Sequence, residues 1–349
     1  MLFEIGIFGL LLTILLSLPF ILFPYSPPPK IKKVKPKPVD VVLFALNEPD
    51  EIIKQSLLSL KELKGKKRIF LIKGGEDSRV LKNFCKKNKI NYIFDESRGK
   101  ASALNNFVKK NKTKYIAVFD CDERIVDGNL LLDALALFNE KTAYVQTVKI
   151  FPANNILERS MRITNETFLA NVQEGEGKKG RAFFAGSVAL LSKNAIVDSG
   201  FFSEDAVVED IDFSFKSFRK GYRGRFIPKI YALGRTPSPL AFVKQHLRYV
   251  YGNGQLVRKF GFNRVLLALP ALSIFNSLLL LSVNPLAYAT IFFEMLFAAF
   301  IGKAIFNEFF ASFLSAFVNF VLLPIPRSVY FLLGLLNVNV IFRTTHVRV

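Results

Sequence analysis

The hydrophobic and polar positions divide the chain into two long apolar regions that enclose a region of mixed character. Residues 1–23 are almost wholly apolar, and about 20 such residues in a helix cross a bilayer. They predict an N-terminal transmembrane helix. Residues 263–342 are again apolar and predict three or four C-terminal transmembrane helices. The span candidates are residues 265–283, 286–304, 308–323 and 329–336.

Between these regions, short β-rich runs alternate with helical patterns. This alternation predicts an α/β domain with a largely parallel sheet over residues 39–235. The expected helices include residues 51–63, which follow a start signal of Pro and acids, and residues 100–110, which have one apolar face. Ligands of such sheets bind at the carboxyl ends of the strands. The expected strands are residues 40–45, 68–72, 92–94, 115–119 and 144–148.

A Pro- and Lys-rich segment, residues 24–38, joins the first apolar region to this domain. Repeated prolines exclude a regular helix, so we expect an extended linker. The lysines follow the apolar region, whereas a cleaved signal peptide carries its bases first. By the positive-inside rule, the α/β domain is therefore expected in the cytoplasm.

The chain is strongly basic, with 48 basic and 28 acidic residues and a net charge of +20. Anionic lipid headgroups explain this excess. No nucleic-acid-binding motif accompanies it, so we expect no nucleic-acid partner. The two cysteines, Cys85 and Cys121, do not suggest a disulfide framework and agree with a reducing compartment.

Two aspartates follow an apolar run in the middle of the domain. Asp120 and Asp122 come directly after the expected strand 115–119, so both carboxylates can turn toward one site at the end of the strand. Two such oxygen ligands beside a diphosphate suit Mg²⁺ or Mn²⁺. An isolated Asp-x-Asp is more often a solvated turn. The pair alone therefore indicates only a candidate metal site.

A second acidic cluster, Glu209-Asp210, stands at the start of an expected helix with an apolar stripe of phenylalanines. One interpretation is a favourable interaction of these acids with the helix dipole. The other is catalytic: Asp210 removes the proton from an acceptor hydroxyl, and Glu209 orients it. Asp212 is interpreted as a solvated or capping residue.

A third cluster lies in the segment Gln-His-Leu-Arg-Tyr. Helical spacing places Gln245, Arg248 and Tyr249 on one face. Arginine suits a phosphate, and an aromatic ring suits the apolar face of a sugar. An interfacial amphipathic helix within residues 236–262, with Tyr as its anchor, fits the same pattern, and both interpretations can hold together. His246 is interpreted as an ordinary surface residue.

Together and in this order, the three clusters resemble the family 2 glycosyltransferases, in particular the membrane-integrated cellulose-synthase-like and hyaluronan-synthase-like branch. The resemblance covers about residues 39–260 and implies a GT-A fold, a nucleotide-sugar donor, a divalent metal and an inverting displacement. Further segments are similar to family motifs in the same order. These are residues 45–48, 98–105, 145–147, 183–187, 192–202 and 220–223.

The resemblance also implies roles for individual residues. Lys100, in the Arg-Gly-Lys segment, is expected to help hold the nucleotide. The residues expected at the donor are Asn47, Glu48, Asp77, Lys100, Asp120 and Arg248. The residues expected at the acceptor are Phe184, Gly186, Ser187, Gln245 and Tyr249.

The chain departs from the family pattern at several positions. Tyr249 stands where Trp is usual, and Ala185 replaces a frequent Cys. The second expected strand ends in Lys-Gly-Gly-Glu-Asp where an acidic pair normally reads the base, and Asp77 is its expected counterpart. No gating segment of the cellulose-synthase type follows the third cluster, which weakens the prediction of a processive polymerase.

We therefore predict a multi-pass cell-membrane glycosyltransferase with a cytoplasmic catalytic domain. It is expected to pass a sugar from a nucleotide-sugar donor to a lipid or a growing glycan, with uridine as the expected base and Mg²⁺ or Mn²⁺ as the cofactor. Membrane lipids are expected partners. Two alternatives stay open: a polyprenyl-phosphate glycosyltransferase that makes a lipid-linked sugar, and a non-catalytic nucleotide-binding membrane scaffold.

Overall fold

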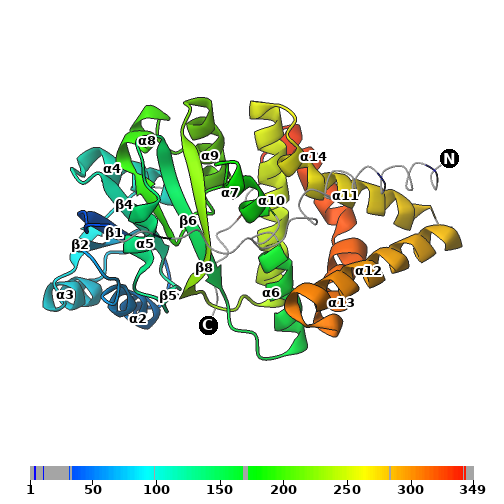
Figure 1. Ribbon diagram of the computed structural model, residues 1–349, viewed down its shortest axis with the longest axis horizontal. Helices are drawn as coiled ribbons and strands as arrows, with labels where there is room; N and C mark the ends of the chain where they lie inside the picture. The colour runs from blue at the N-terminus through cyan, green and yellow to red at the C-terminus, as the bar shows by residue number, and fades with distance from the viewer. Residues whose placement is uncertain are drawn as a thin grey trace.

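The computed structural model describes an α/β domain joined to a group of apolar helices (Figure 1). The predicted N-terminal transmembrane helix and much of the linker fall outside the described residues, as does Arg98 of the Arg-Gly-Lys segment. The described residues are 4, 11, 31, 34–97, 99–167, 172–282, 284–340 and 342.

One mixed sheet forms the centre of the α/β domain. In the described part of the chain it has eight strands in the order β3-β2-β1-β4-β7-β6-β8-β5. The first four in this order are parallel, whereas β7 is antiparallel to both of its neighbours. The strands are β1 (Val39–Ala45), β2 (Lys67–Lys73), β3 (Asn91–Phe94), β4 (Tyr115–Asp120), β5 (Arg124–Ile125), β6 (Thr142–Ile150), β7 (Ala189–Ser192) and β8 (Arg223–Leu233).

The five predicted strands correspond to β1, β2, β3, β4 and β6. The sheet is mixed rather than largely parallel, because β7 and β5 pair antiparallel with their neighbours, whereas β6 and β8 are parallel. β5 and β7 escaped prediction because runs of two and four residues carry no measurable alternation. β8 contains a proline and several charged residues, which obscured its strand pattern.

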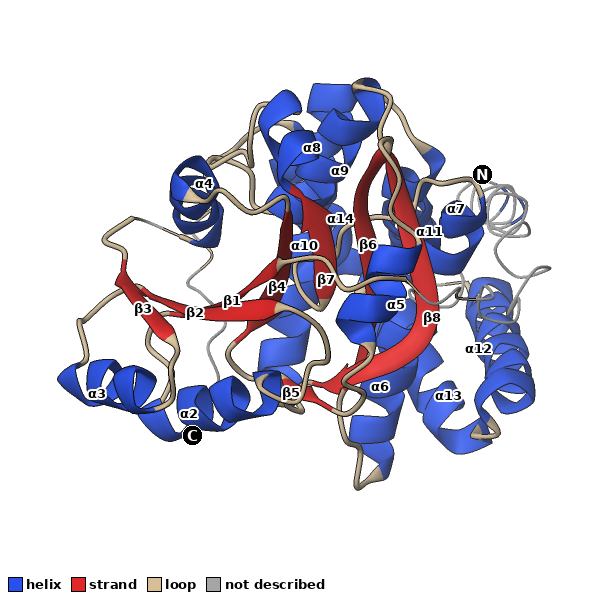
Figure 2. Ribbon diagram, turned by 60° about the vertical axis from the view of Figure 1, so that its left-hand side comes forward, coloured by secondary structure: helices blue, strands red, loops and turns tan. Residues whose placement is uncertain are grey.

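Helices cover both faces of the sheet, which explains why β1 is apolar at nearly every position (Figure 2). Val41 and Leu43 face α2, α3 and α5, whereas Val42 and Phe44 face α4, α8 and α9. The predicted helices over residues 51–63 and 100–110 are confirmed as α2 and α4. The helices are α2 (Asp50–Leu60), α3 (Arg79–Lys87), α4 (Lys100–Lys110), α5 (Leu130–Ala136), α8 (Lys193–Asp198) and α9 (Glu209–Arg219).

Two further helices, α6 (Ile156–Thr167) and α7 (Glu174–Lys178), lie between β6 and β7 in the chain. The long helix α10 (Pro239–Phe260) then joins the α/β domain to the C-terminal helices (Figure 1). Its start is capped by Ser238, whose hydroxyl accepts a hydrogen bond from the Ala241 amide at 3.3 Å. Val250 of α10 packs in one apolar cluster with Val208, directly before α9, and Phe331 of α14.

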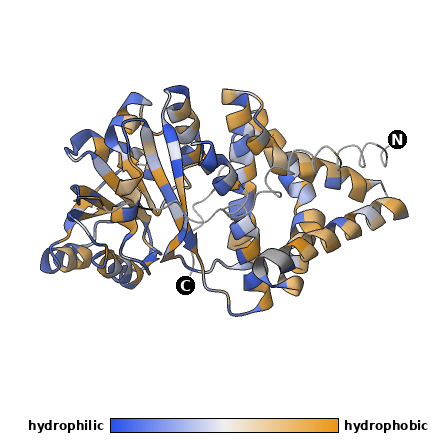
Figure 3. Ribbon diagram, viewed as in Figure 1, coloured by the Kyte–Doolittle hydropathy of each residue, from blue (hydrophilic) through white to orange (hydrophobic). Residues whose placement is uncertain are grey.

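The C-terminal helices are markedly apolar (Figure 3). Among the described residues, one helix is long and apolar enough to cross a membrane, at Pro285–Lys303, and a pair bent by 57° would give a second if counted as one span. The predicted three or four C-terminal spans are therefore not confirmed. These helices are α11 (Arg264–Leu281), α12 (Pro285–Phe306), α13 (Phe309–Phe317), the π-helix η2 (Val318–Leu322) and α14 (Pro324–Leu335).

Candidate active site

Three carboxylates gather where β4 ends. The strand is buried and apolar up to Phe119, and the chain then turns through Asp120, Asp122 and Glu123. One oxygen from each of these side chains lies within 4.8 Å of the others. The expected convergence of the two aspartates is thus seen, with Glu123 as a third member. Such a set of hard oxygen ligands fits Mg²⁺ or Mn²⁺.

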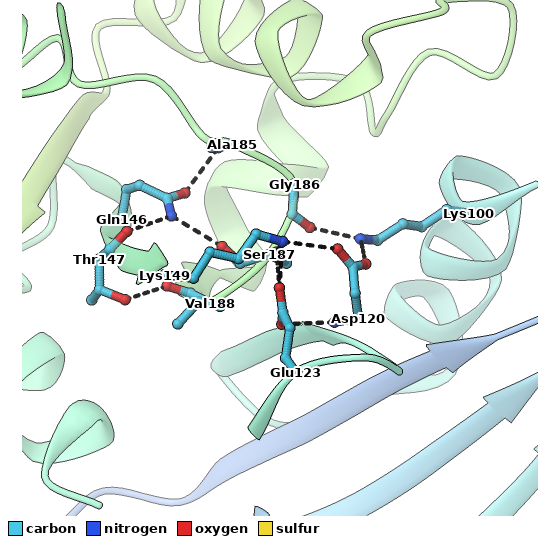
Figure 4. A network of polar contacts seen from close by, with 10 residues as sticks. All are labelled: Lys100, Asp120, Glu123, Gln146, Thr147, Lys149, Ala185, Gly186, Ser187 and Val188. Carbon is cyan, nitrogen blue, oxygen red and sulfur yellow. Dashed lines mark hydrogen bonds and ion pairs between the residues drawn. The ribbon is translucent and has the colours of Figure 1, made fainter. Parts of the chain in front are cut away.

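Two lysines from neighbouring elements enter this cluster (Figure 4). Lys100, at the start of α4, forms an ion pair with Asp120 and donates to the Gly186 carbonyl at 2.8 Å. Lys149 of β6 lies 2.5 Å from Glu123 and 3.4 Å from Asp120. The acidic cluster therefore carries ammonium groups on two sides.

Burial and these cations divide the carboxylates into two classes. Burial opposes the ionisation of Asp120, but Lys100 and Lys149 hold its pKa well below the usual range. Burial raises the pKa of Asp122 above its ordinary value and that of Glu123 to about 7. Asp120 is thus the member of the cluster that stays ionised most readily, as a cation ligand requires.

The loop before β7 is held against the cluster by a buried amide. Gln146 of β6 accepts from the Ala185 amide at 2.8 Å and donates to the Ser187 carbonyl at 3.0 Å. Between them, Gly186 has φ of +86°, a conformation that side chains disfavour. The Ser187 hydroxyl donates to Glu123 at 2.6 Å. This loop consequently has its backbone fixed beside the carboxylates.

Glu209 and Asp210 begin α9 and lie on the other side of this loop. A Cβ placed on Gly186 would stand only 3.0 Å from Asp210 Oδ2, so the Asp210 carboxylate lies directly against the Gly186 backbone. Burial, followed by the adjacent Asp210 charge, raises the pKa of Glu209 to about 7, and burial also raises the pKa of Asp210. Glu209 is thus biased toward accepting a proton near neutral pH, and Asp210 accepts a proton more readily than an exposed aspartate does.

The third cluster reaches this site from α10. The charge of Arg248 acts on both Glu209 and Asp210, and its Nε is buried without a hydrogen-bond partner among the described residues. The Arg248 guanidinium lies 5.7 Å from the centre of the Tyr249 ring. The Tyr249 hydroxyl is within electrostatic reach of Asp210 and Lys149. Half-buried Gln245 precedes them by one turn.

The remaining predicted donor residues lie beyond the ends of β1 and β2. The Glu48 carboxylate accepts from the Leu46 amide at 2.6 Å, and its charge acts on Asp122. The Asn47 side chain lies against Gly75, because a Cβ there would stand 2.7 Å from its oxygen. Asp77 instead accepts from Tyr92 at 2.7 Å and pairs with Lys82 at 2.5 Å. The structure thus places Glu48 beside the carboxylate cluster, whereas the partners of Asp77 come from β3 and α3.

Comparison with known proteins identifies the family of this chain. Residues 115–340 match the family model for glycosyl transferase family group 2. This chain belongs to that family. It is a glycosyltransferase, and the matched region contains the three polar clusters.

Curated relatives are polysaccharide synthases. The glycosyltransferase is 29% identical over 234 residues to the cellulose synthase catalytic subunit (UDP-forming) of Xanthomonas axonopodis pv. citri, covering 63% of this chain and 32% of that protein. It is 26% identical over 225 residues to the poly-beta-1,6-N-acetyl-D-glucosamine synthase of Staphylococcus aureus, covering 62% of this chain and 54% of that protein. The chain thus spans about a third to a half of the length of these relatives.

The fold is shared with a solved glycosyltransferase. A mannosyltransferase from Pyrobaculum calidifontis, in complex with GDP-Man and Mn²⁺, matches with a TM-score of 0.67 at 16% identity. The match covers 90% of this chain and 97% of that one. The glycosyltransferase thus has the same overall fold as this neighbour, including the region of the apolar helices.

Some residues of the glycosyltransferase site have no sequence signal of their own. Glu123 and Lys149 stand outside the motif positions predicted for chemistry, although Glu123 follows the Asp-x-Asp pair directly. Gln146 lies in the motif segment 145–147, but no role was predicted for its side chain. Phe184 was expected at the acceptor. Its ring is 2% exposed and packs among aromatic rings of the core, where it supports the loop that carries Gly186. Ser187 is also buried and contacts the carboxylate cluster.

Two residues interpreted as exposed are buried. Asp212 is fully buried, where it pairs with Lys259 at 2.5 Å and accepts from Ser203. His246 is buried against Phe242 and contacts Arg327. Both interpretations were wrong because the partners lie 47 and 81 residues away in the chain, respectively. The two cysteines are buried and free, as expected without a disulfide framework.

Proposed function

We propose that this glycosyltransferase is membrane-embedded and transfers a sugar, with inversion, from a nucleotide-sugar donor to a lipid or a growing glycan. The observation that carries the proposal is the position of Gly186. Its carbonyl accepts from Lys100, and its Cα side faces Asp210. One short loop thus lies between the lysine-flanked carboxylate cluster and Asp210, so a leaving group at the cluster and an acceptor at Asp210 would be neighbours.

Asp120, Asp122 and Glu123 are proposed to hold Mg²⁺ or Mn²⁺. When bound, the cation would neutralise charge on the departing nucleoside diphosphate. The ammonium groups of Lys100 and Lys149 lie at the same cluster and supply further positive charge for the phosphates. The half-buried Arg248 is proposed to contact the diphosphate, because its Nε–H, which has no hydrogen-bond partner among the described residues, suits a phosphate oxygen.

Asp210 is proposed to act as the base. It takes the proton of the acceptor hydroxyl while that oxygen attacks the anomeric carbon and the bond from that carbon to the diphosphate breaks. Glu209 stands beside Asp210, and the Asp210 charge contributes to the raised pKa of Glu209. Gln245 and Tyr249 are proposed to contact the acceptor, together with the backbone of the loop at Gly186.

The donor is proposed to be a uridine diphosphate sugar, held also by Asn47, Glu48 and Asp77. The printed name of the cellulose synthase relative, which is UDP-forming, supports this choice. The mannosyltransferase neighbour contains GDP-Man, so guanosine diphosphate sugars are the second class to test. A lipid-linked single sugar is the alternative product, and the length of the product separates it from a glycan.

The membrane topology is likewise a proposal. Residues 1–23 would anchor the chain, 24–38 would link it to a cytoplasmic catalytic domain at 39–235, and 236–262 would lie at the interface before spans within 263–342. Support comes from the apolar helix Pro285–Lys303 and from the exposed apolar side chains of α12 and α14. Membrane lipids are proposed partners, and nucleic acid is not.

Release of nucleoside diphosphate by the purified full chain tests this function. The protein in lipid nanodiscs is incubated with Mn²⁺ and a panel of UDP- and GDP-sugars, with and without extracted lipids. We expect release with one donor class, loss of release with a chelator, and a loss of roughly 10²-fold to 10⁴-fold in Asp210→Asn. Donor binding should survive this substitution, because Asp210 is assigned to the acceptor side.

Asp205→Asn is the matched control, since Asp205 is an exposed acid five residues before the base. It should keep normal release. Equal release by Asp210→Asn and Asp205→Asn would remove Asp210 from the role of base. Folded protein that binds a donor and never releases diphosphate, with any lipid or glycan, would favour the non-catalytic scaffold.

A further inference from the structure

A basic cavity lies at the end of the sheet opposite to the active site. Its volume is about 630 Å³, and it forms where the strands β1, β2 and β4 begin. Six of its described lining residues are cationic and one, Asp40, is acidic. The cationic residues are Lys37, Lys66, Lys67, Arg68, Lys112 and Lys114. The cavity therefore concentrates positive charge around one hollow.

The single acid of the cavity is already paired. Arg68 Nε and Nη2 donate to the two carboxylate oxygens of Asp40 at 2.7 and 2.8 Å, and Nη2 also donates to the Thr113 hydroxyl at 2.9 Å. These bonds neutralise Asp40 and fix Arg68 at the cavity wall. Lys67 is turned aside, because its ammonium group donates to backbone carbonyls just after α2. Four lysines are left to determine the charge of the hollow.

These four lysines, Lys37, Lys66, Lys112 and Lys114, are exposed and have no carboxylate partner in the part of the chain that the structure describes. The ammonium groups of Lys37 and Lys114 both lie over the Tyr115 ring, 5.6 and 5.8 Å from its centre. Like charges gathered in this way repel one another, and an anion held between them relieves the repulsion. Phosphate is such an anion, because lysine ammonium groups bind it as point charges.

The size and lining of the cavity indicate the kind of anion. Its volume falls within the range of small-molecule sites, roughly 300–1,000 Å³. The lysines come from three segments that meet at one hollow, 37–40, 66–68 and 112–115, which favours a compact ligand over an extended chain. The one aromatic ring in the described lining, Tyr115, is 6% exposed and offers no face on which a nucleic-acid base could stack. We propose that this cavity binds a compact, water-soluble anion that carries two or more phosphate groups.

The position of the cavity separates it from both the apolar helices and the active site. β1 and β2 lie at the opposite end of the molecule from α11 and α12 (Figure 1). Among the described residues, no large exposed hydrophobic side chain lines the cavity, so the acyl chains of a lipid would find no surface there. Tyr115 and Asp120 stand at the two ends of β4, roughly 17 Å apart at about 3.3 Å per residue. Binding in the cavity therefore does not depend on whether sugar transfer occurs.

Calorimetric titration of the full chain with tripolyphosphate tests the proposal. The protein is kept in a neutral maltoside detergent at low salt, without metal and without nucleotide. We expect binding of tripolyphosphate, and binding of orthophosphate at least about tenfold more weakly, because a single phosphate reaches fewer of the lysines. The triple variant Lys66→Gln, Lys112→Gln and Lys114→Gln should bind tripolyphosphate at least about tenfold more weakly. Without ligand, this variant should unfold at a higher temperature than the natural chain, because it lacks the repulsion. A purely structural role of the three lysines would lower that temperature instead.

The matched control is the triple variant Lys86→Gln, Lys87→Gln and Lys220→Gln, which removes the same charge at exposed lysines outside the cavity. It should bind tripolyphosphate as the natural chain does. Equal weakening in the two triple variants would overturn the proposal, because the overall charge of the protein would then explain the binding. Lys149→Met should also bind normally, and a loss of binding there would place the anion at the active site and overturn the proposal.

Two further results would overturn the proposal. One is the absence of tripolyphosphate binding by the folded natural chain. The other is tighter binding of a poly-glutamate peptide or of a single-stranded RNA than of tripolyphosphate, lost with the same three lysines. That result would assign the cavity to an extended acidic partner rather than to a compact anion.

Discussion

Lys149 Nζ lies 2.5 Å from Glu123 Oε1 and also donates to the Ser187 hydroxyl at 2.8 Å. Lys149 stands near the end of β6, and Glu123 follows β4, so the ion pair links two strands that are separated in the sheet by β7. Because the same ammonium group is 3.4 Å from Asp120, it is within reach of a phosphate held at the cluster. We assign Lys149 to the stabilisation of the leaving diphosphate.

Lys149→Met should lower kcat by roughly 10²-fold, because a positioned cation that meets developing charge contributes on this scale. The side chain keeps its length and loses its charge. Steady-state kinetics with the natural donor checks this. Lys141→Met, at an exposed lysine just before β6, should leave kcat unchanged. Identical rates in both variants would show that Lys149 only supports the structure.

Gly186→Ala should impair catalysis through the position of the base. The added methyl would meet Asp210 Oδ2 at 3.0 Å and would suffer strain at φ of +86°. A displacement of this kind can cost about 10²-fold in rate. Gly221→Ala is the control, since Gly221 has φ of +81° with nothing within 4 Å of the added methyl.

Both glycine variants should lose stability by roughly 1–2 kcal/mol from the left-handed backbone conformation alone. Only Gly186→Ala should lose activity when the two are compared at a temperature where both are folded. Chemical denaturation measures the first quantity, and diphosphate release measures the second. A similar loss of rate in both variants would assign the effect to backbone strain rather than to contact with Asp210.

The pH dependence should reflect the raised pKa of Asp210. A carboxylate base acts in its ionised form, so kcat/KM should fall as the pH drops through this raised pKa. Burial is the largest cause of the raised pKa of Asp210, and Glu209→Gln leaves that burial in place, so this variant should keep the acid limb of the profile where it is. An acid limb that moves in Glu209→Gln would show that Glu209 controls it.

The first half of the sheet and the position of the aspartates that follow β4 were predictable from sequence because both depend on local pattern. Strands β1 and β4 are continuous buried runs, and the aspartates after β4 stand next to the strand in the chain. The apolar run of β4 and the position of its end therefore predicted that the Asp120 and Asp122 carboxylates lie close together, as the structure shows. Glu209 and Asp210 were found in the same way, at the start of a helix with a visible apolar stripe.

The rest depends on contacts between distant segments. Lys149 reaches Glu123 across 26 residues, and Gln146 reaches Ala185 across 39. No periodicity within either segment encodes such a pairing. The same holds for Arg327, which looks in sequence like an ordinary charge after a proline pair and is in fact buried against α10. Tertiary packing decides these positions, so their roles emerged only from the structure.

The close crossing of α10 and α14 yields a final prediction. At Gly334, an added Cβ would stand 2.0 Å from the Tyr251 carbonyl oxygen, so Gly334→Ala must push the two helices apart. Overpacking of this kind costs roughly 1–3 kcal/mol. Gly234→Ala, directly after β8, is the control, because Gly234 lacks the left-handed backbone conformation and its added methyl would lie 4.0 Å from the nearest atom, the Ile150 carbonyl oxygen.

Thermal unfolding in detergent should therefore show a lower midpoint for Gly334→Ala than for Gly234→Ala. Because α10 carries Arg248 to the catalytic carboxylates, a shift of this helix should also raise the KM for the donor. A normal midpoint for Gly334→Ala would mean that the crossing is looser than its geometry indicates. A lower midpoint with an unchanged KM would mean that α10 holds Arg248 in place without α14.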